Sequence, residues 1–469
     1  MTSVAALFLL LTTAVTFFGM PSIAQSPKAR LETWRAQNHF VQRMMESKPQ
    51  KKKKPLSSEI RPVVLVRSSH SFLEPKTQRK LDMITKSRLS SGNKLKLLLN
   101  HESSVAKFRL VEKAQTSLFV SALLLHCDVG GKKLVAKLIA ASRRGVDVRI
   151  VIDGIGAWAG LGCFQTLRQA GIKIVISARS LSPASVDWEM HDKLFMQDGR
   201  RAVVGGQNLG SWYFDSNGTD DNYRDTDVLV EGPVVRDIAR RFIRIWEEQQ
   251  PLDASLESFV RELEELDIQD ALEKRIGKKN YSQWLDVEGG KGVCRFVSQD
   301  PHRGTFHVFD AYTFLAEQSR QRVRFHAMSF EPTGSPRHAR MLGALKKLAA
   351  RPKGTVDVIT NGPGLLTSKT MPSQLGSWFG SSFLSSTYNG LKDSEIRVHA
   401  YGTFLHSKVY SFDDVVVGIG SFNYDQSGIR CQESTLICVD AELSEDVQRM
   451  FERDLQNSAH VPVVEPPEK

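Results

Sequence analysis

A repeated eight-residue pattern is the feature of this sequence that most constrains its fold. HDKLFMQD begins at His191 and HSKVYSFD begins at His406, and each has Lys two positions and Asp seven positions after the histidine. Matching offsets then lead in both copies to a glycine and an asparagine, which are Gly205, Asn208, Gly420 and Asn423. Because the chain has only 12 histidines in 469 residues, five positions matching twice in register indicate an internal repeat.

The segments around both copies are typical of alternating helices and strands. LVAKLIAASRRGVDVRIVIDG precedes the first motif and MLGALKKLAARPKGTVDVITNG precedes the second; each predicts a helix, a turn at glycine and a buried strand. Further strand-like runs lie at 172–177 and 395–401, and RAVVGGQN and VVVGIGSFN resemble returning strands that end in a turn. The pattern predicts an α/β fold with two tandem domains, each a mixed sheet flanked by helices.

The motif residues suggest phosphoryl chemistry. We expect each motif to lie on a strand, with His191 and Lys193 on one face and Asp192 on the other. Two copies packed about a pseudo-twofold axis would gather two His, two Lys and two Asn around one cavity. Histidine can attack phosphorus or move a proton, while Lys and Asn stabilise the phosphoryl oxygens. Such a site needs no metal or other cofactor, and the sequence shows no clustered ligands at metal spacing.

The doubled HxKxxxxD pattern, followed by G(S/G)xN, resembles the phospholipase D superfamily over roughly residues 95 to 445. WYFDSNGTDDNYRDTDVLVEGPVVRDIARRFIRIW resembles the first half of bacterial cardiolipin synthases, and FLHSKVYSFDDVVVGIGSFNYDQSG with Glu433 resembles their second half. The resemblance implies two phospholipase D-like domains. It also implies a phosphodiesterase that hydrolyses or transfers the phosphatidyl group of phospholipids through a phosphohistidine intermediate.

The same resemblance implies roles for individual residues. His191 matches the nucleophile and His406 the general acid and base, while an acidic residue after each asparagine orients the histidine: Asp225 in the first copy and Glu433 in the second. Asp198 and Asp413 complete the motifs, and either could simply anchor its strand through an ion pair. The residues expected to bind phosphate are Lys193, Lys408, Asn208 and Asn423.

The second copy departs from this family pattern. TNGPG and the Ser-rich stretch TSKTMPSQLGSWFGSSFLSST stand where cardiolipin synthases have a compact helix, so the acceptor remains open. Two other functions compete with lipid chemistry: a metal-independent nuclease of the same superfamily and a non-catalytic, membrane-associated phosphate-binding protein. Aromatic residues near the motifs favour a phospholipid substrate if they form an apolar rim, although core packing is the alternative; these are Trp158, Trp212, Tyr213, Phe214, Trp378, Phe379 and Phe383.

The chain outside the repeats adds context. The apolar run before Ser22 and Ala24 predicts a signal peptide or membrane anchor over residues 1–24, and hence an exported or membrane-anchored protein. The net charge is +11, and KPQKKKKP at 48–55 is expected to be a solvated linker or an arm for anionic lipid or nucleic acid. Five cysteines, an odd number, rule out a complete disulfide framework.

These features predict the following order of segments along the chain. A basic linker and N-terminal extension occupies 25–95, the two phospholipase D-like domains occupy 96–250 and 291–460, and a helical connector occupies 251–290. Because both motifs are in one chain, we expect the protein to be active as a monomer on phospholipid at a membrane surface.

Overall fold

The computed structural model describes most of the repeated region. It covers residues 72, 74–154, 156–177, 189–214, 222–276, 292–332, 335–361 and 390–460, without the side chains of residues 158 and 268–276. The predicted signal peptide or anchor, the basic run at 48–55 and most of the linker lie outside the described residues. So do Trp378, Phe379 and Phe383, the side chain of Trp158 and the last part of the predicted connector.

The first half of the fold runs from β1 to α8 and is preceded by α3. Its elements are α3 (Pro75–Thr85), β1 (Ser90–Leu99), α4 (His101–Lys113), β2 (Ser117–Ala122), α5 (Val129–Arg143), β3 (Asp147–Asp153), α6 (Leu161–Gln169), β4 (Lys173–Ser177), β5 (Leu194–Gln197), β6 (Arg201–Gly205), α7 (Ser211–Phe214), β7 (Thr226–Glu231) and α8 (Val235–Glu247). A 3₁₀ helix, η2 (Gly156–Gly160), precedes α6. Helix α9 (Ala254–Ile276) then lies where the sequence predicts a helical connector.

The second half repeats this order. Its elements are β8 (Gly292–Gln299), the 3₁₀ helix η5 (Pro301–Arg303), α11 (His307–Gln318), β9 (Arg322–His326), α12 (Pro336–Ala349), β10 (Thr355–Asn361), β11 (Arg397–Tyr401), β12 (Val409–Phe412), β13 (Val416–Gly420), β14 (Glu433–Val439), α15 (Ala441–Gln456) and β15 (Ser458–His460). The helices and strands expected just upstream of the motifs are therefore present as α5, β3 and β4 in one half and α12, β10 and β11 in the other.

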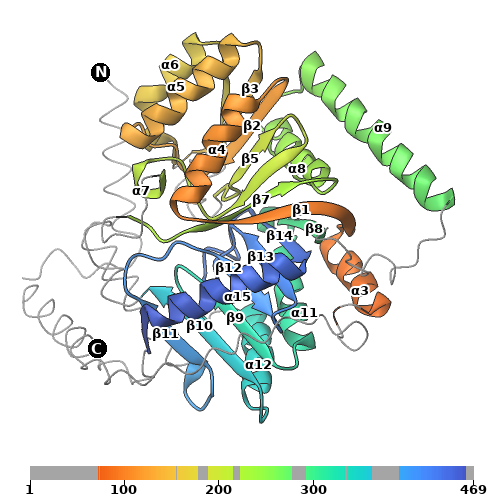
Figure 1. The fold of residues 1–469 in the computed structure, drawn as a ribbon, viewed down its shortest axis with the longest axis vertical. Helices are drawn as coiled ribbons and strands as arrows, with labels where there is room; N and C mark the ends of the chain where they lie inside the picture. The colour runs from red at the N-terminus through yellow and green to blue at the C-terminus, as the bar shows by residue number, and fades with distance from the viewer. Residues whose placement is uncertain are drawn as a thin grey trace, which may run out of the picture. The chain divides into compact units, whose positions relative to one another are not determined.

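The strand order makes the internal symmetry visible. Within the described ranges, fifteen strands form one sheet in the order β15-β11-β10-β9-β12-β13-β14-β8-β1-β7-β6-β5-β2-β3-β4. Read outward from the centre, β1-β7-β6-β5-β2-β3-β4 corresponds strand for strand to β8-β14-β13-β12-β9-β10-β11. The two central strands, β1 and β8, are antiparallel. This arrangement is the pseudo-twofold relation that the repeat predicts, and Figure 1 shows β1 running between the two halves.

Parallel pairing sets the edge on which each motif lies. In the first half β2, β3 and β4 are parallel, and β5 runs antiparallel to β2. The residues just before β5 therefore lie beyond the carboxyl ends of β2 and β3, the edge at which open α/β sheets bind ligands. The second half is built in the same way, with β9, β10 and β11 parallel and β12 antiparallel to β9.

Local sequence explains where several helices begin. Asp128 caps α5 by accepting a hydrogen bond from the Gly131 amide, and Asp440 caps α15 through the Leu443 amide. Ser335 caps α12, and the proline after it lacks the N–H that a first helical turn would leave unpaired. The strands behind the motifs, β3 and β10, are almost wholly buried, as their β-branched runs predict.

Among the described residues, two groups of buried side chains hold the layers together. One lies under α4, α5 and α6 and belongs to the first half alone, with residues such as Leu118, Leu134 and Phe164. The other is shared by both halves, because it contains α8 residues such as Trp246 together with α15 residues such as Phe451. The halves are thus joined by a common apolar core as well as by the sheet, and the site described below depends on this union.

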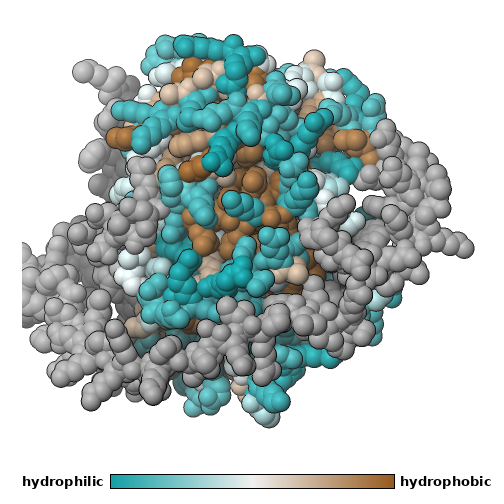
Figure 2. Space-filling model, viewed as in Figure 1, coloured by the Kyte–Doolittle hydropathy of each residue, from teal (hydrophilic) through white to brown (hydrophobic). Residues whose placement is uncertain are grey.

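The face drawn in Figure 2 has apolar side chains near its middle, surrounded by polar ones. A shallow groove of about 390 Å³ between α4 and the β1–β7 strands has Leu98, Leu110 and Leu229 among its lining residues. Its rim includes charged residues such as Lys96 and Arg109, and none of the residues predicted to act in the site lines it.

Candidate active site

Each motif begins just before a strand rather than within one. The structure starts β5 at Leu194 and β12 at Val409, so the expected strand covers only the part of the motif that follows the lysine. The His–x–Lys segments are held by the opposite half instead. The His191 amide donates to the Gln432 carbonyl at 2.9 Å, and the His406 amide donates to the Arg224 carbonyl at 2.8 Å. The two motifs therefore meet at the junction between the halves.

The histidines and the acidic residues are paired across that junction. His191 Nδ1 lies 2.9 Å from Glu433 Oε1, and His406 Nδ1 lies 2.8 Å from Asp225 Oδ2. The sequence did not specify which histidine each acid orients, and the structure pairs each acid with the histidine of the other repeat. The reason is topological: the segments before β7 and β14 run beside the motif of the other half. Each histidine–acid pair is therefore complete only when both halves are docked.

The two motif lysines lie in the same buried region. Lys193 Nζ donates to the carbonyl of His191 at 2.7 Å, and Lys408 Nζ donates to the carbonyl of His406. Their side chains are nearly inaccessible, while His191 and His406 keep 7% and 6% of their surface exposed. Each lysine acts electrostatically on both histidines, which places all four groups in one site.

Burial controls the protonation of these groups. It lowers the pKa of His191 and His406 well below the ordinary value, and the positive charges of Lys193 and Lys408 add to that effect. Burial also lowers the pKa of Lys193 to about 8 and that of Lys408 to about 7, although nearby carboxylates oppose the shift. Neutral histidines beside cationic lysines form a site that favours an anion.

Burial acts on the acidic partners in the opposite direction. It raises the pKa of Asp225, with Lys408 opposing, and raises that of Glu433 well above its usual range, with Lys193 opposing. Glu433 also accepts a hydrogen bond from Ser421, and Asp225 accepts one from the Thr226 amide at 2.8 Å. These second bonds fix each carboxylate toward its histidine.

The two asparagines have different surroundings. The Leu124 amide donates to Asn208 Oδ1 at 3.2 Å, and Asn208 Nδ2 donates to the Tyr213 hydroxyl at 3.1 Å. Asn423 is also buried, but its Oδ1 has no hydrogen-bond partner among the described residues. The glycines before Asn208 are sterically required, because a Cβ on Gly206 would lie 2.3 Å from Asp225 Oδ1.

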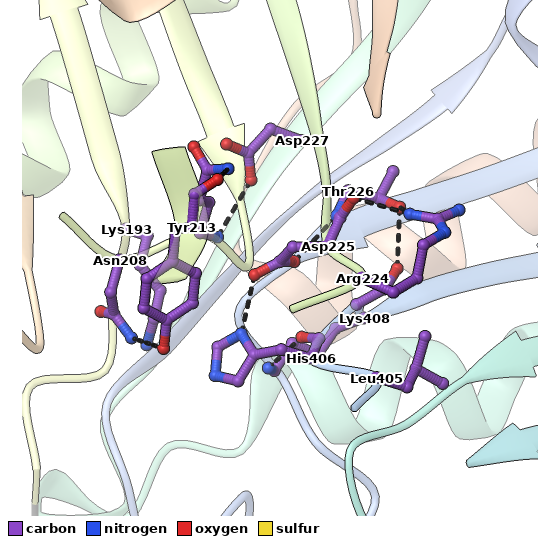
Figure 3. A network of polar contacts seen from close by, with 12 residues as sticks. Lys193, Asn208, Tyr213, Arg224, Asp225, Thr226, Asp227, Leu405, His406 and Lys408 are labelled. Atoms are coloured by element: carbon purple, nitrogen blue, oxygen red, sulfur yellow. Dashed lines mark hydrogen bonds and ion pairs between the residues drawn. The ribbon is translucent and has the colours of Figure 1, made fainter. Parts of the chain in front are cut away.

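Tyr213 links the two halves of the site in a way that the sequence did not reveal. Its hydroxyl contacts Asn208 of the first half, and its ring meets the His406 ring edge-on at 5.2 Å between centroids (Figure 3). Tyr223 stacks on the same histidine at 6.0 Å. Both aromatic residues come from the first half, and no motif spacing points to them.

The motif aspartates lie at the far end of their strands. The four residues of β5, Leu194–Gln197, lie between the His–x–Lys segment and Asp198, and they span roughly 13 Å. Asp198 Oδ1 accepts hydrogen bonds from the Thr116 and Ser117 amides, and Asp413 accepts them from three successive amides at residues 320–322. The structure therefore does not bring Asp198 or Asp413 to the histidines. Each binds backbone amides at the start of a neighbouring strand, in place of the expected ion pair to a side chain.

Buried ion pairs hold the motif segments from behind. Asp192 Oδ2 lies 2.6 Å from Arg241 of α8, and both side chains are almost fully buried. Arg224, whose carbonyl binds the second motif, lies 2.7 Å from Asp454 of α15. No sequence pattern predicts either ion pair, because the two residues of each pair lie far apart along the chain.

The predicted aromatic rim is only partly present among the described residues. Trp212 keeps 41% of its surface exposed, whereas Tyr213 and Phe214 keep 3% and 1%. For these two residues the core-packing alternative holds, because α7 is short and turns both rings inward against α4 and the site. For Phe214 the burying contacts include the ring of Phe108.

Comparison with known proteins follows the same division into two halves. A family model described as "Cardiolipin synthase, PLD-like domain" matches residues 108–246 and 314–455, more than half of the chain. The chain belongs to this family. Each matched segment contains one complete motif, so the predicted membership of the phospholipase D superfamily is confirmed.

Curated relatives and solved structures agree with this assignment. Cardiolipin synthase A of Pseudomonas syringae pv. syringae (strain B728a) is 25% identical over 382 residues, which cover 80% of this chain and 71% of the relative. Cardiolipin synthase C of Escherichia coli (strain K12) is 27% identical over 374 residues, covering 69% and 76%. The crystal structure of phosphatidylserine synthase of Haemophilus influenzae Rd KW20 shares the fold, with a TM-score of 0.58 and 12% identity over 82% of this chain and 92% of that one.

Two kinds of feature are absent from the described residues. No group of three or more His, Cys, Asp or Glu side chains in the described ranges is arranged to hold a metal ion. Among the helices in those ranges, none combines the length and the apolar character needed to cross a membrane.

Proposed function

We propose that this protein is a phospholipase D-type phosphatidyltransferase, which moves the phosphatidyl group of a phospholipid to water or to an alcohol through a phosphohistidine. The observation that carries the proposal is the pair of crossed contacts, His191 with Glu433 and His406 with Asp225, beside two buried lysines. The cardiolipin synthase relatives supply the substrate class. In the same proposal the functional domains are residues 96–250 and 291–460, joined by a connector that includes α9.

Each histidine is oriented for chemistry by its acidic partner. A carboxylate that accepts a hydrogen bond from Nδ1 keeps the proton on that atom, so the lone pair of a neutral imidazole is on Nε2. The low pKa of His191 keeps it neutral and able to attack. A phosphodiester brings negative charge into the site, which raises the tendency of His406 to bind a proton. We assign His191 as the nucleophile and His406 as the proton donor.

The proposed reaction has two displacements at phosphorus. In the first, His191 Nε2 forms a bond to phosphorus, the bond to the leaving alkoxide breaks, and His406 gives that oxygen its proton. In the second, His406 takes a proton from water or an alcohol, whose oxygen attacks phosphorus and breaks the bond to His191. Lys193, Lys408, Asn208 and Asn423 would bind the phosphoryl oxygens as their charge increases.

The direct test is product analysis. Purified protein is incubated with phosphatidylglycerol and phosphatidylethanolamine in detergent micelles containing a primary alcohol, and the lipids are identified by mass. We expect phosphatidyl-alcohol or phosphatidic acid, and turnover lower by about three orders of magnitude in His191→Ala and in His406→Ala. In a His406→Asn variant we expect phosphorus on His191. An adduct on His406 in a His191 variant would reverse the two roles.

Two outcomes would overturn the proposal. Cleavage of single-stranded DNA without any lipid product would establish the nuclease alternative. Phospholipid binding without turnover of either substrate would favour the non-catalytic, phosphate-binding alternative. Either result would leave the fold and the crossed contacts unchanged.

The location of the protein is part of the proposal. We infer export, or anchoring by the N-terminal apolar segment, to an oxidising compartment. The structure pairs Cys127 with Cys163 and Cys294 with Cys438, and disulfides persist mainly outside the reducing cytosol. We also propose that a monomer is active, because one chain supplies both members of each histidine–acid pair. Fractionation of cells and light scattering of the active protein test these two points.

A further inference from the structure

Exposed apolar side chains are concentrated at one edge of the first half. Among the described residues, five large hydrophobic side chains are exposed. Three of them lie in the first turns of successive helices: Val129 of α5 is 66% exposed, Leu161 of α6 is 52% exposed and Trp212 of α7 is 41% exposed. The other two, Met83 and Leu266, lie on α3 and α9.

The strand directions place these three residues at the edge that carries the site. Helices α5 and α6 follow the carboxyl ends of the parallel strands β2 and β3, and α7 follows the turn after β6. The first motif lies at the same edge, because the Met190 amide donates to Asp153 at the end of β3. In Figure 1, α5, α6 and α7 lie on the same side of the first half.

Side-chain and backbone contacts hold the segments that carry these three residues together. Asp128 caps α5 and also accepts a hydrogen bond from the Ser211 amide at 3.0 Å, so Val129 is fixed beside the start of α7. The disulfide between Cys127 and Cys163 joins the start of α5 to the start of α6. The apolar tips therefore form one surface, defined here as the α5–α7 edge: Val129, Leu161 and Trp212.

The charge of this edge suits an anionic lipid surface. Lys132 and Lys133 are exposed on α5, three and four positions after Val129. The one carboxylate in the turn, on Asp128, is engaged by backbone amides of Gly131 and Ser211. Apolar tips that enter the headgroup boundary, with lysines beside them at the level of the phosphates, are the usual combination in interfacial membrane binding.

A chain of aromatic contacts leads from this edge to the site. The Trp212 ring lies 5.3 Å from that of Tyr223, which stacks on His406. We propose that the α5–α7 edge docks on an anionic phospholipid bilayer, with Val129, Leu161 and Trp212 in the interface, and delivers a headgroup along this path to His406. The inference rests on the proposed function for its substrate, but it makes a separate claim about which surface meets the membrane.

The test compares two double variants of the full-length protein. Val129→Ser with Leu161→Ser removes two residues of the α5–α7 edge, whereas Met83→Ser with Leu266→Ser removes two exposed apolar side chains elsewhere. Binding is measured by co-sedimentation with vesicles of phosphatidylglycerol and phosphatidylcholine. We expect the edge variant to bind at least about tenfold more weakly and the control to bind like wild type. Both should keep wild-type rates on a short-chain phospholipid below its micellar concentration.

Trp212 provides a direct readout of insertion. Brominated phosphatidylcholine should quench part of the tryptophan fluorescence on vesicle binding, and that part should be missing in Trp212→Phe. Equal vesicle binding by the two double variants would overturn the proposal, as would unquenched Trp212. A loss of dimers in the edge variant, with vesicle binding unchanged, would show instead that the edge meets a second copy of the chain. Lipid turnover with normal binding by the edge variant would reject this inference while leaving the proposed function intact.

Discussion

Replacing Asp225 with Asn tests the crossed arrangement of the site most sharply. The carboxylate of Asp225, from the first repeat, accepts the Nδ1 proton of His406 from the second. Asparagine has nearly the same shape, and its Oδ1 can still accept the Thr226 amide. Its Nδ2 group would then face His406 Nδ1. Because two donors cannot pair, the imidazole proton would move to Nε2 and the general base would be lost.

The size of the effect follows from the charges. During turnover His406 becomes an imidazolium next to a buried carboxylate, with Nδ1 and Oδ2 separated by 2.8 Å. For charge centres about 4 Å apart at an effective dielectric constant of about 20, the attraction is about 4 kcal/mol. Losing it from the transition state lowers kcat by about three orders of magnitude. The assay is release of headgroup from phosphatidylglycerol micelles under saturating conditions.

Thermal unfolding separates this effect from misfolding. Burial raises the pKa of Asp225, so the folded protein binds its proton more tightly than the unfolded chain does. Ionisation of Asp225 therefore lowers the free energy of unfolding as the pH rises above the pKa of an aspartate in the unfolded chain. A neutral asparagine removes this loss of stability. We expect the melting temperature of Asp225→Asn at pH 7 to equal or exceed that of wild type. A kcat within tenfold of wild type would refute the crossed pairing as a catalytic device, and a melting temperature lowered by several degrees would mean that the lost activity reflects damage to the fold.

Four further outcomes follow from the same contacts. Because the pKa values are about 7 for Lys408 and about 8 for Lys193, kcat should fall between about pH 7 and 9 as the lysines lose their charge. The free energy of unfolding should rise over the same window, because the unfolded chain then binds more protons than the folded protein. A pH series in which kcat and stability fall together would contradict this. Asp198→Ala and Asp413→Ala should each lower the free energy of unfolding by about 2–4 kcal/mol in urea titrations, because several backbone amides lose their acceptor, with kcat per folded molecule within about threefold of wild type. Tyr213→Phe should lower kcat/KM by about three- to tenfold through loss of the Asn208 hydrogen bond. Tyr213→Leu should lower kcat/KM further and shift the His406 pKa measured by NMR, whereas equal effects of the two variants would assign no role to the ring. Activity should survive EDTA, because the lysines supply the positive potential; loss in EDTA that a divalent ion restores would show that a metal takes part.

The sequence by itself determined the architecture and the chemical groups of this protein. The repeated motif, the helix–glycine–strand segments before it and the glycine-rich returning strands are local patterns, and β3, β10, β6 and β13 appear where those patterns place them. Local patterns suffice because hydrophobic periodicity and turn residues act over a few positions along the chain. The motifs also specified which histidines, lysines and asparagines are candidates for the site.

Only the tertiary structure decided how these groups meet. The exchange of Asp225 and Glu433 between the two halves, and the ring of Tyr213 on His406, arise where segments far apart in sequence pack side by side. The motif aspartates show the same limit: they belong to the motifs, but β5 and β12 carry them to the opposite edge of the sheet, where they bind backbone amides. The spacing of two residues in one strand determines which face of the sheet each side chain occupies and how far apart they lie. Contacts between strands depend instead on the order of the strands in the sheet, which no single segment encodes.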